Sequence, residues 1–383
     1  MSVVYVHIGL PKTGTTYLQD RLWRNRDLAL RESGLLYPGN AISDHFHVAT
    51  HLQPDRYLDW ADPAFAGTWS TIRKQIRAWP GTSLLSHELF STATQAQIAS
   101  LIDDLSFADE VHVIATVRDL ARQLPSVWQE NAKNQRQASF SEFFDNVRAH
   151  AGPLDGGTPA QVDTDETAPE EPFWEFQDYV AILQRWSAAV GADRVHLVTV
   201  PAGRVPAGDG LWERFLSVLG VDATPLNLVV PGTNTSLSAA QADFVRRLNA
   251  RLQPENIEWR RYERVIKGRL IGEILFEAQS GPPQGLSTEQ RGWASVYAQQ
   301  MVAAVTRAGY PVTGDVADLG VSPESSGDDA VPTAAEVLDV ALDTVAEMVQ
   351  RAPLPDVSPA WQTRAVNVVR RVRRRALGLR GPR

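Results

Sequence analysis

The sequence has no cysteine in 383 residues. That absence excludes disulfides, thiol nucleophiles and cysteine-ligated zinc sites. A long hydrophobic run is missing too, because no apolar stretch approaches the roughly 20 residues that a membrane-spanning helix requires. The apolar stretch at the start follows no basic segment, so we expect it to be a core strand rather than a signal peptide. These absences together predict a cytoplasmic protein.

An excess of positive charge is also lacking, since the formal net charge is −8. Because phosphate backbones attract basic surfaces, we expect no nucleic-acid partner. Hydrophobic residues make up 43% of the chain and charged residues 21%, as in an ordinary globular protein. A chain of this length accommodates one large α/β domain with a tail, or two to three smaller units.

The most informative stretch is the first. A β-branched run from Val3 to Ile8 gives way to Gly9 and Pro11, and a helical pattern begins near Thr15. A strand, a glycine-containing turn and a helix in this order are typical of a phosphate-binding loop, because backbone N–H groups and the helix dipole converge on one concavity. The residues that we expect to contact the phosphate form one continuous loop: Gly9, Pro11, Lys12, Thr13, Gly14, Thr15 and Thr16.

The order of residues in this loop differs from a Walker A loop, in which lysine follows the second glycine directly. Here Lys12 stands two positions before Gly14. The stretch from His7 to Gln19 instead resembles the 5′-phosphosulfate loop of sulfotransferases that use 3′-phosphoadenosine-5′-phosphosulfate (PAPS), particularly a bacterial branch with the pattern H-I-G-x-P-K-T-G-T-T-x-x-Q. The resemblance implies a P-loop NTPase-like three-layer α/β sandwich with a central parallel sheet. It further implies PAPS as donor, a small-molecule or glycolipid acceptor, and no metal.

A second phosphate site is predicted near the middle of the chain. The clearest strand, Glu110 to Val117, ends at Arg118, and Ser126 follows on a predicted helix. A guanidinium can clamp a phosphate with two bonds, and a hydroxyl can donate a third. The spacing resembles the 3′-phosphate motif of sulfotransferases, although Asp119-Leu120 replaces the Asn-Pro of that motif. For the glycine-rich segment that completes this site in cytosolic members, Lys267-Gly268-Arg269 is the candidate replacement.

A general base is predicted after another short strand. Leu84 and Leu85 are followed by His87 and Glu88, and chemistry in an open parallel sheet takes place at the carboxyl ends of strands. Transfer to a hydroxyl requires a base that takes its proton. We prefer Glu88, in part because the bacterial branch has a similar S-x-E. The alternatives are His87 as the base, and a purely structural Glu88 that caps the following turn.

Three histidines lie within seven positions, from His45 to His51. On a helix, His47 and His51 would share a face, as two zinc ligands do. No third ligand is near in the sequence, so we expect no metal. The bacterial branch often has a His-rich patch here, so the resemblance implies that His47 lines the acceptor pocket, with packing as the alternative.

The domain prediction is a sulfotransferase domain over 1–313, with a sheet core over about 1–235 and a helical part over 236–313. A linker over 314–332 and a helical, Arg-rich tail over 333–383 follow. Residues 359–383 contain eight Arg and no acid, and their apolar side chains form one stripe: Trp361, Ala365, Val368, Val369, Val372 and Ala376. Such a helix can lie on an anionic membrane at the inner face, dock on its own core or a second protomer, or stay solvated. The oligomeric state is left open.

The function predicted from the sequence is sulfuryl transfer by in-line displacement. In this scheme Lys12 and the loop amides stabilise charge on the leaving phosphate oxygen. Two alternatives belong to other classes. A P-loop kinase or NTPase would depend on magnesium, and a non-catalytic scaffold would bind adenosine bisphosphate and membranes without transferring a group.

Overall fold

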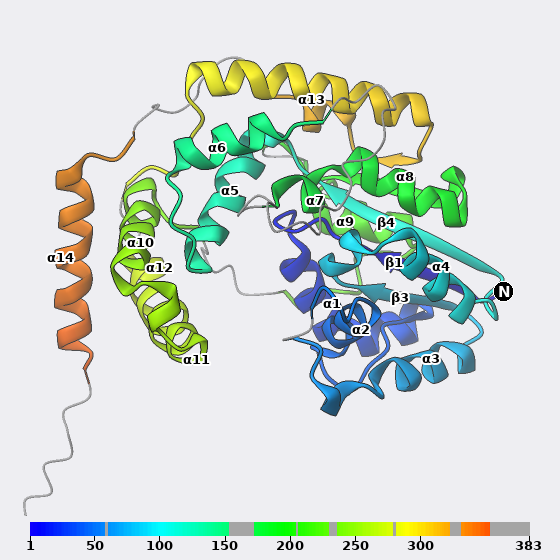
Figure 1. Ribbon diagram of the computed structural model, residues 1–383. Helices are drawn as coiled ribbons and strands as arrows, with labels where there is room; N and C mark the ends of the chain where they lie inside the picture. The colour runs from blue at the N-terminus through cyan, green and yellow to red at the C-terminus, as the bar shows by residue number, and fades with distance from the viewer. Residues whose placement is uncertain are drawn as a thin grey trace, which may run out of the picture.

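The computed structural model describes residues 1–57, 60–152, 172–203, 206–229, 236–278, 281–321 and 331–352. At its centre lies a sheet of six strands in the order β2-β3-β1-β4-β5-β6, and every neighbouring pair is parallel (Figure 1). The strands are β1 (Val3–His7), β2 (Leu35–Leu36), β3 (Thr82–Ser86), β4 (Glu110–Val117), β5 (Val195–Thr199) and β6 (Val312–Thr313).

Helices flank the sheet and extend beyond it. The α-helices are α1 (Thr15–Ser33), α2 (Asp44–Leu52), α3 (Thr68–Ala78), α4 (Gln95–Asp104), α5 (Leu120–Lys133), α6 (Phe140–Ala149), α7 (Phe173–Gln177), α8 (Tyr179–Val190), α9 (Leu211–Val218), α10 (Ala239–Leu252), α11 (Trp259–Tyr262), α12 (Phe276–Ala278), α13 (Thr288–Ala308) and α14 (Ala334–Gln350). A π-helical segment, η5 (Glu263–Leu275), joins α11 to α12. Short 3₁₀ turns are η1 (Pro63–Phe65), η2 (Glu88–Thr92), η3 (Ala192–Arg194), η4 (Pro254–Asn256) and η6 (Val316–Leu319). Within these residues, no helix is both long and apolar enough to cross a bilayer.

The two faces of the sheet carry separate cores, because side chains alternate along each strand. On one face Leu84 and Ile114 pack against α1 and α9. On the other, Val6, Leu85 and Val113 pack against α3, α4 and α8. The chain is therefore an α/β protein with a helical layer on each side of a parallel sheet, as the sequence predicts.

Four helices begin at capping boxes, which the S/T-x-x-E/Q pattern of the sequence predicts at these positions. Ser139, Ser238, Ser287 and Thr333 each cap a helix, and in every case the Glu or Gln three residues later returns the second bond of a capping box. The strand predicted over Glu110 to Val117 is confirmed with the same bounds.

Three expectations need correction. The amphipathic pattern over 173–190 predicts one helix, but the structure has two, because the Asp178 side chain accepts a hydrogen bond from the Ala181 N–H and starts α8. The sheet does not end near 235, since β6 pairs with β5. The predicted linker begins with the ordered turn η6, whose Leu319 is buried and whose Asp318 contacts β5.

Candidate functional site

Three predicted site segments meet at one edge of the sheet. Strands β3, β1 and β4 are neighbours, and His7 at the end of β1 is in register with Ser86 and Ile114. The loop after β1, the His87-Glu88 pair after β3 and Arg118 after β4 therefore all follow carboxyl ends on the same side. In open parallel sheets this edge is where ligands bind.

The loop after β1 has the backbone of an anion cradle. Gly9, Lys12 and Gly14 have positive φ values of 85°, 66° and 93°. Helix α1 starts at Thr15, and its N-cap residue, Gly14, has no side chain to cap the first N–H groups. Uncapped N–H groups at a helix N-terminus carry partial positive charge and are free to bind an anion.

A buried chain of hydrogen bonds supports the loop after β1 on the side that faces the sheet. The Thr13 hydroxyl donates to the Leu10 carbonyl at 2.6 Å and lies 2.6 Å from the Thr116 hydroxyl. His7 continues the chain, with Nε2 3.3 Å from the Thr116 hydroxyl and Nδ1 2.7 Å from that of Ser86. Burial, and to a lesser extent the charge of His87, lowers the pKa of His7 to about 3, so the ring is neutral. The Thr13 hydroxyl thus supports the loop from its buried side.

Lys12 projects from the loop onto helix α5. Its Nζ donates to Glu130 Oε2 at 2.8 Å, and the Lys133 ammonium lies 2.8 Å from the same oxygen. Burial alone would raise the pKa of Glu130, but Lys12 and Lys133 outweigh it and lower that pKa to about 2. Asn134 follows Lys133 in the sequence, and its Oδ1 accepts a hydrogen bond from Lys267 Nζ of η5 at 2.8 Å. Two of the four lysines in the chain therefore contact Glu130, and a third, Lys267, is linked to that carboxylate through Asn134.

Arg118 is linked to this loop through a glutamine. Its Nε donates to Gln123 Oε1 at 3.0 Å, and Gln123 Nε2 donates to the Pro11 carbonyl at 2.7 Å. Gln177 holds Gln123 in place, since its Oε1 accepts from Gln123 Nε2 at 2.7 Å. The two predicted phosphate-binding segments are thus connected by one side chain.

Arg118 and Ser126 lie beside the same turn of α5. Arg118 Nη2 donates to the Arg122 carbonyl at 2.9 Å, the group to which the Ser126 N–H is directed in a regular α-helix. Burial, and secondarily the charge of Arg122, lowers the pKa of Arg118 to about 10, although Asp119 opposes the effect. Arg118 forms no ion pair in the described part of the chain, and the Ser126 hydroxyl has no hydrogen-bond partner there. A protonated guanidinium and a free hydroxyl are therefore available together.

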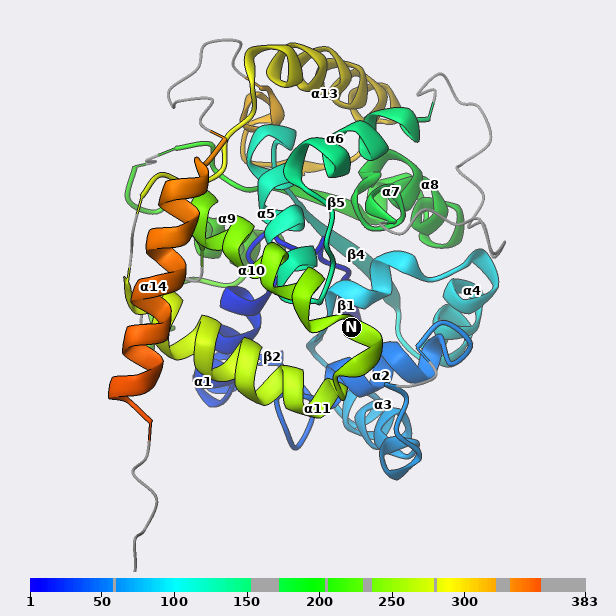
Figure 2. The same cartoon turned by 60° about the vertical axis from the view of Figure 1, so that its left-hand side comes forward.

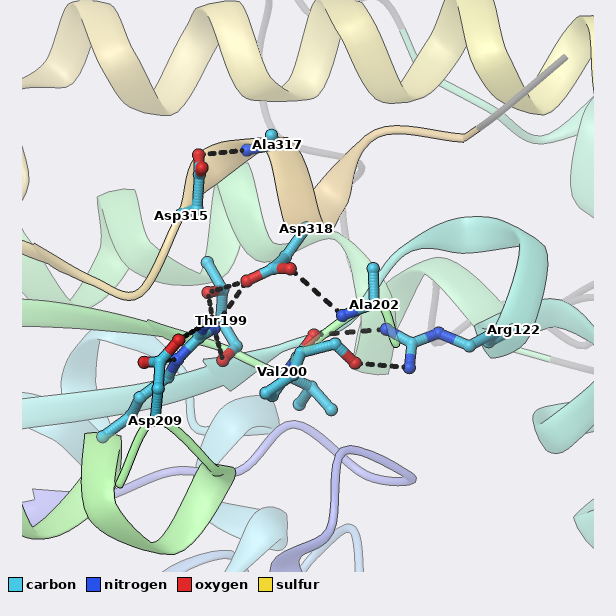
Figure 3. A network of polar contacts seen from close by, with 10 residues as sticks. Arg122, Thr199, Val200, Ala202, Asp209, Asp315, Ala317 and Asp318 are labelled. Carbon is cyan, nitrogen blue, oxygen red and sulfur yellow. Dashed lines mark hydrogen bonds and ion pairs between the residues drawn. The ribbon is translucent and has the colours of Figure 1, made fainter. Parts of the chain in front are cut away.

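A polar network fixes the start of α5 (Figure 3). Arg122 pairs with Asp119 and donates to the carbonyls of Val200 and Pro201 at 3.2 and 2.7 Å. Beside it, Asp318 of η6 accepts from Thr199 and from the Ala202 N–H at 3.0 and 3.1 Å. Arg122 is thus held by carbonyls and a carboxylate, whereas Arg118, four residues earlier, forms no ion pair within the described residues.

Glu88 borders the loop directly. A Cβ atom placed on Gly9 would lie 2.7 Å from Glu88 Cβ, so only glycine allows this approach. Gln19 of α1 donates to Glu88 Oε2 and to the Ser86 carbonyl, both at 3.3 Å. This gives Gln19, a residue of the N-terminal pattern, a positioning contact that the sequence alone does not predict.

His87, rather than Glu88, caps the turn that follows. His87 Nδ1 accepts from the Leu89 N–H at 3.2 Å, so the structural alternative for Glu88 is wrong. Burial lowers the pKa of His87, although Glu88 opposes the effect. Because Nδ1 accepts, the proton of the neutral ring is on Nε2.

His47 lies near this pair on helix α2. Its ring stacks on Phe65 at 3.7 Å between centroids, and its Nδ1 is buried without a hydrogen-bond partner in the described residues. Burial lowers the pKa of His47. The charge of His47 in turn contributes to lowering the pKa of His87. Among the residues the structure describes, no three His, Asp or Glu side chains are grouped to hold a metal ion.

Comparison of the chain with protein-family models, with curated proteins and with solved structures gave no match.

Proposed function

We propose that this protein is a sulfotransferase that moves a sulfuryl group from PAPS to a hydroxyl of a small-molecule or glycolipid acceptor, on a P-loop NTPase-like fold. The observation that carries the proposal is the pairing of two anion sites. The uncapped start of α1 is one, and Arg118, which forms no ion pair within the described residues and lies beside Ser126, is the other. Gln123 connects them through Pro11. A nucleotide with a phosphate group at both its 5′ and 3′ positions suits such a pair.

The lysine cluster supports the same donor. Lys12 must leave Glu130 to reach a ligand in the loop, and Lys133 remains with that carboxylate when it does. Both partners of the Lys12–Glu130 pair are about one-third exposed, at 31% and 33%. Lys133 keeps the Glu130 carboxylate paired when Lys12 moves to a ligand, so the move does not leave a charge without a partner. A phosphate group with two negative charges therefore competes readily for Lys12.

In the proposed step, the acceptor oxygen forms a bond to sulfur while the bond from sulfur to the 5′-phosphate oxygen breaks. Adenosine 3′,5′-bisphosphate leaves, and the acceptor proton passes to a protein base. Lys12 and the α1 amides stabilise the negative charge that develops on the leaving oxygen. Arg118 and Ser126 hold the 3′-phosphate, so binding energy away from sulfur orients the donor.

Glu88 is the proposed base. Its carboxylate borders the loop at Gly9 and is held by Gln19. His87 is a weaker candidate, because its Nδ1 accepts from Leu89 and its Nε2 carries the proton. The ring can donate to an acceptor but has no free lone pair with which to remove a proton.

The acceptor side of the proposed site is aromatic. His47 and Phe65 stack, and Phe46 lies 5.5 Å from His87 and 6.2 Å from Trp60 between ring centroids. Trp60 and Phe65 are 51% and 39% exposed, so part of each side chain is open to solvent although each ring also stacks on a neighbour. An acceptor with an apolar or ring-shaped face is favoured here.

The test is transfer of a labelled sulfuryl group from PAPS to a panel of phenols, sugars and glycolipids, in buffer containing EDTA. We expect transfer to at least one hydroxyl acceptor, and its loss in Lys12→Ala. Lys74→Ala, which removes an exposed lysine from α3, is the matched control and keeps full activity. Magnesium-dependent ATP hydrolysis without transfer would instead identify a kinase or NTPase. Bisphosphate binding without transfer to any acceptor would favour the scaffold.

A further inference from the structure

Helix α14 exposes a continuous apolar seam. Val337, Val340 and Thr344 are buried on the side that packs against α10 and η5. The side chains at four other positions face away and are largely exposed: Leu338 (57%), Leu342 (59%), Val345 (56%) and Val349 (70%). α14 lies at the outside of the molecule, and no described element covers this side (Figures 1 and 2).

The spacing of this seam is that of a helix–helix contact. Steps of four, three and four residues separate its members, which is the repeat of the a and d positions in a coiled coil. Single exposed apolar residues need no explanation, but an exposed stripe of four marks a contact surface.

The charge of α14 selects the partner. Its ionisable residues are all acidic: Glu336, Asp339, Asp343 and Glu347. A second copy of α14 would bring these acids against one another, and an anionic bilayer would repel them. The partner that fits is a helix with the same apolar spacing and basic flanks.

The chain itself continues into such a segment. Trp361, Ala365, Val368 and Val372 repeat the steps of four, three and four, and residues 359–383 carry eight Arg and no acid. This segment lies outside the described residues. Eleven residues, 350–360, separate the two seams and include three prolines, which end helices. That length allows an antiparallel return, and the tether keeps the local concentration of the segment high.

We propose that residues 361–376 form a helix that folds back antiparallel on α14, so that the two seams face each other and arginines lie beside the acids of α14. The Arg-rich tail then stabilises the helical side of its own chain instead of binding a membrane. This proposal does not depend on the proposed catalytic function.

Hydrogen exchange of the full-length protein in solution tests the proposal. We expect the amides of 361–376 to exchange at least about tenfold more slowly than in an unstructured peptide, equally at low and high protein concentration. The variant Leu342→Glu/Val345→Glu, which changes only exposed side chains, loses this protection. The control Ala346→Glu/Gln350→Glu adds the same charge beside the seam and keeps it.

Three results would overturn the proposal. The first is fast exchange in the tail that slows only when vesicles containing phosphatidylserine are added. The second is protection that rises with protein concentration, as binding to a second copy requires. The third is protection that survives Leu342→Glu/Val345→Glu.

Discussion

Substitution of Arg118 tests whether its buried charge destabilises the unliganded protein and serves to bind a ligand. Burial lowers its pKa from 12.5 to about 10. The difference of about 2.5 pH units corresponds to about 3 kcal/mol, which is the free-energy cost of keeping the charge in the unliganded protein. Two hydrogen bonds, to Gln123 and the Arg122 carbonyl, offset part of that cost at about 1 kcal/mol each.

We therefore expect Arg118→Gln to stabilise the unliganded protein by about 1 kcal/mol while it weakens binding of adenosine 3′,5′-bisphosphate by about 2 kcal/mol or more. Urea unfolding at pH 7 without nucleotide, and calorimetric titration with the bisphosphate, measure the two effects. Arg122→Gln is the control. Because Arg122 pairs with Asp119 and two carbonyls, its loss should lower stability. If Arg118→Gln destabilised the protein as much as Arg122→Gln does, Arg118 would be structural and the argument would be refuted.

Three further variants address the base, the loop and the buried network. Glu88→Gln should abolish transfer and leave bisphosphate affinity unchanged, whereas His87→Gln should retain measurable transfer; the reverse pattern would make His87 the base. Gly9→Ala should lower the free energy of unfolding in urea by more than about 2 kcal/mol, because the new Cβ would lie 2.7 Å from Glu88 Cβ at a positive φ. Gly34→Ala also has a positive φ but open space around it, so it should lower that free energy by only about 1 kcal/mol. Equal losses in the two variants would show that the close approach to Glu88 does not restrict position 9. Since the pKa of His7 is lowered to about 3, the unfolded chain binds a proton below pH 6.5 that the buried ring does not, and the fold loses up to about 5 kcal/mol of stability as pH falls from 6.5 to 3. The acid limb of a stability–pH curve should be flatter in His7→Asn, and an unchanged limb would contradict the buried neutral ring.

Local signals made much of this fold predictable. Capping residues such as Ser139 and Ser287 mark helix starts because their partners are three residues away in the same sequence. The β-branched run of β4 marks a buried strand for a similarly local reason. The break at Asp178 also has a local cause, because the Asp178 side chain caps α8. The apolar pattern continues on both sides of Asp178, so the sequence still indicates a single helix.

Contacts between distant segments could not be predicted in this way. Glu130 pairs with Lys12, which lies 118 positions earlier in the sequence. Gln123 donates a hydrogen bond to the Pro11 carbonyl, 112 positions earlier. Nothing near either residue identifies its partner, because the pairing depends on β1 and β4 being neighbours. Strand β6 has only two residues, too few to show the alternating pattern of a strand. It is a strand because it pairs with β5.

The central claim is that the α1 loop and Arg118 bind opposite phosphate groups of one nucleotide. The most direct measurement compares the affinities of adenosine 3′,5′-bisphosphate and adenosine 5′-monophosphate for the wild type, Arg118→Gln and Lys12→Ala. We predict that the wild type prefers the bisphosphate strongly, that Arg118→Gln loses this preference, and that Lys12→Ala weakens both ligands by a similar factor. A wild-type protein indifferent to the 3′-phosphate, or an Arg118→Gln variant that keeps the full preference, would contradict the claim.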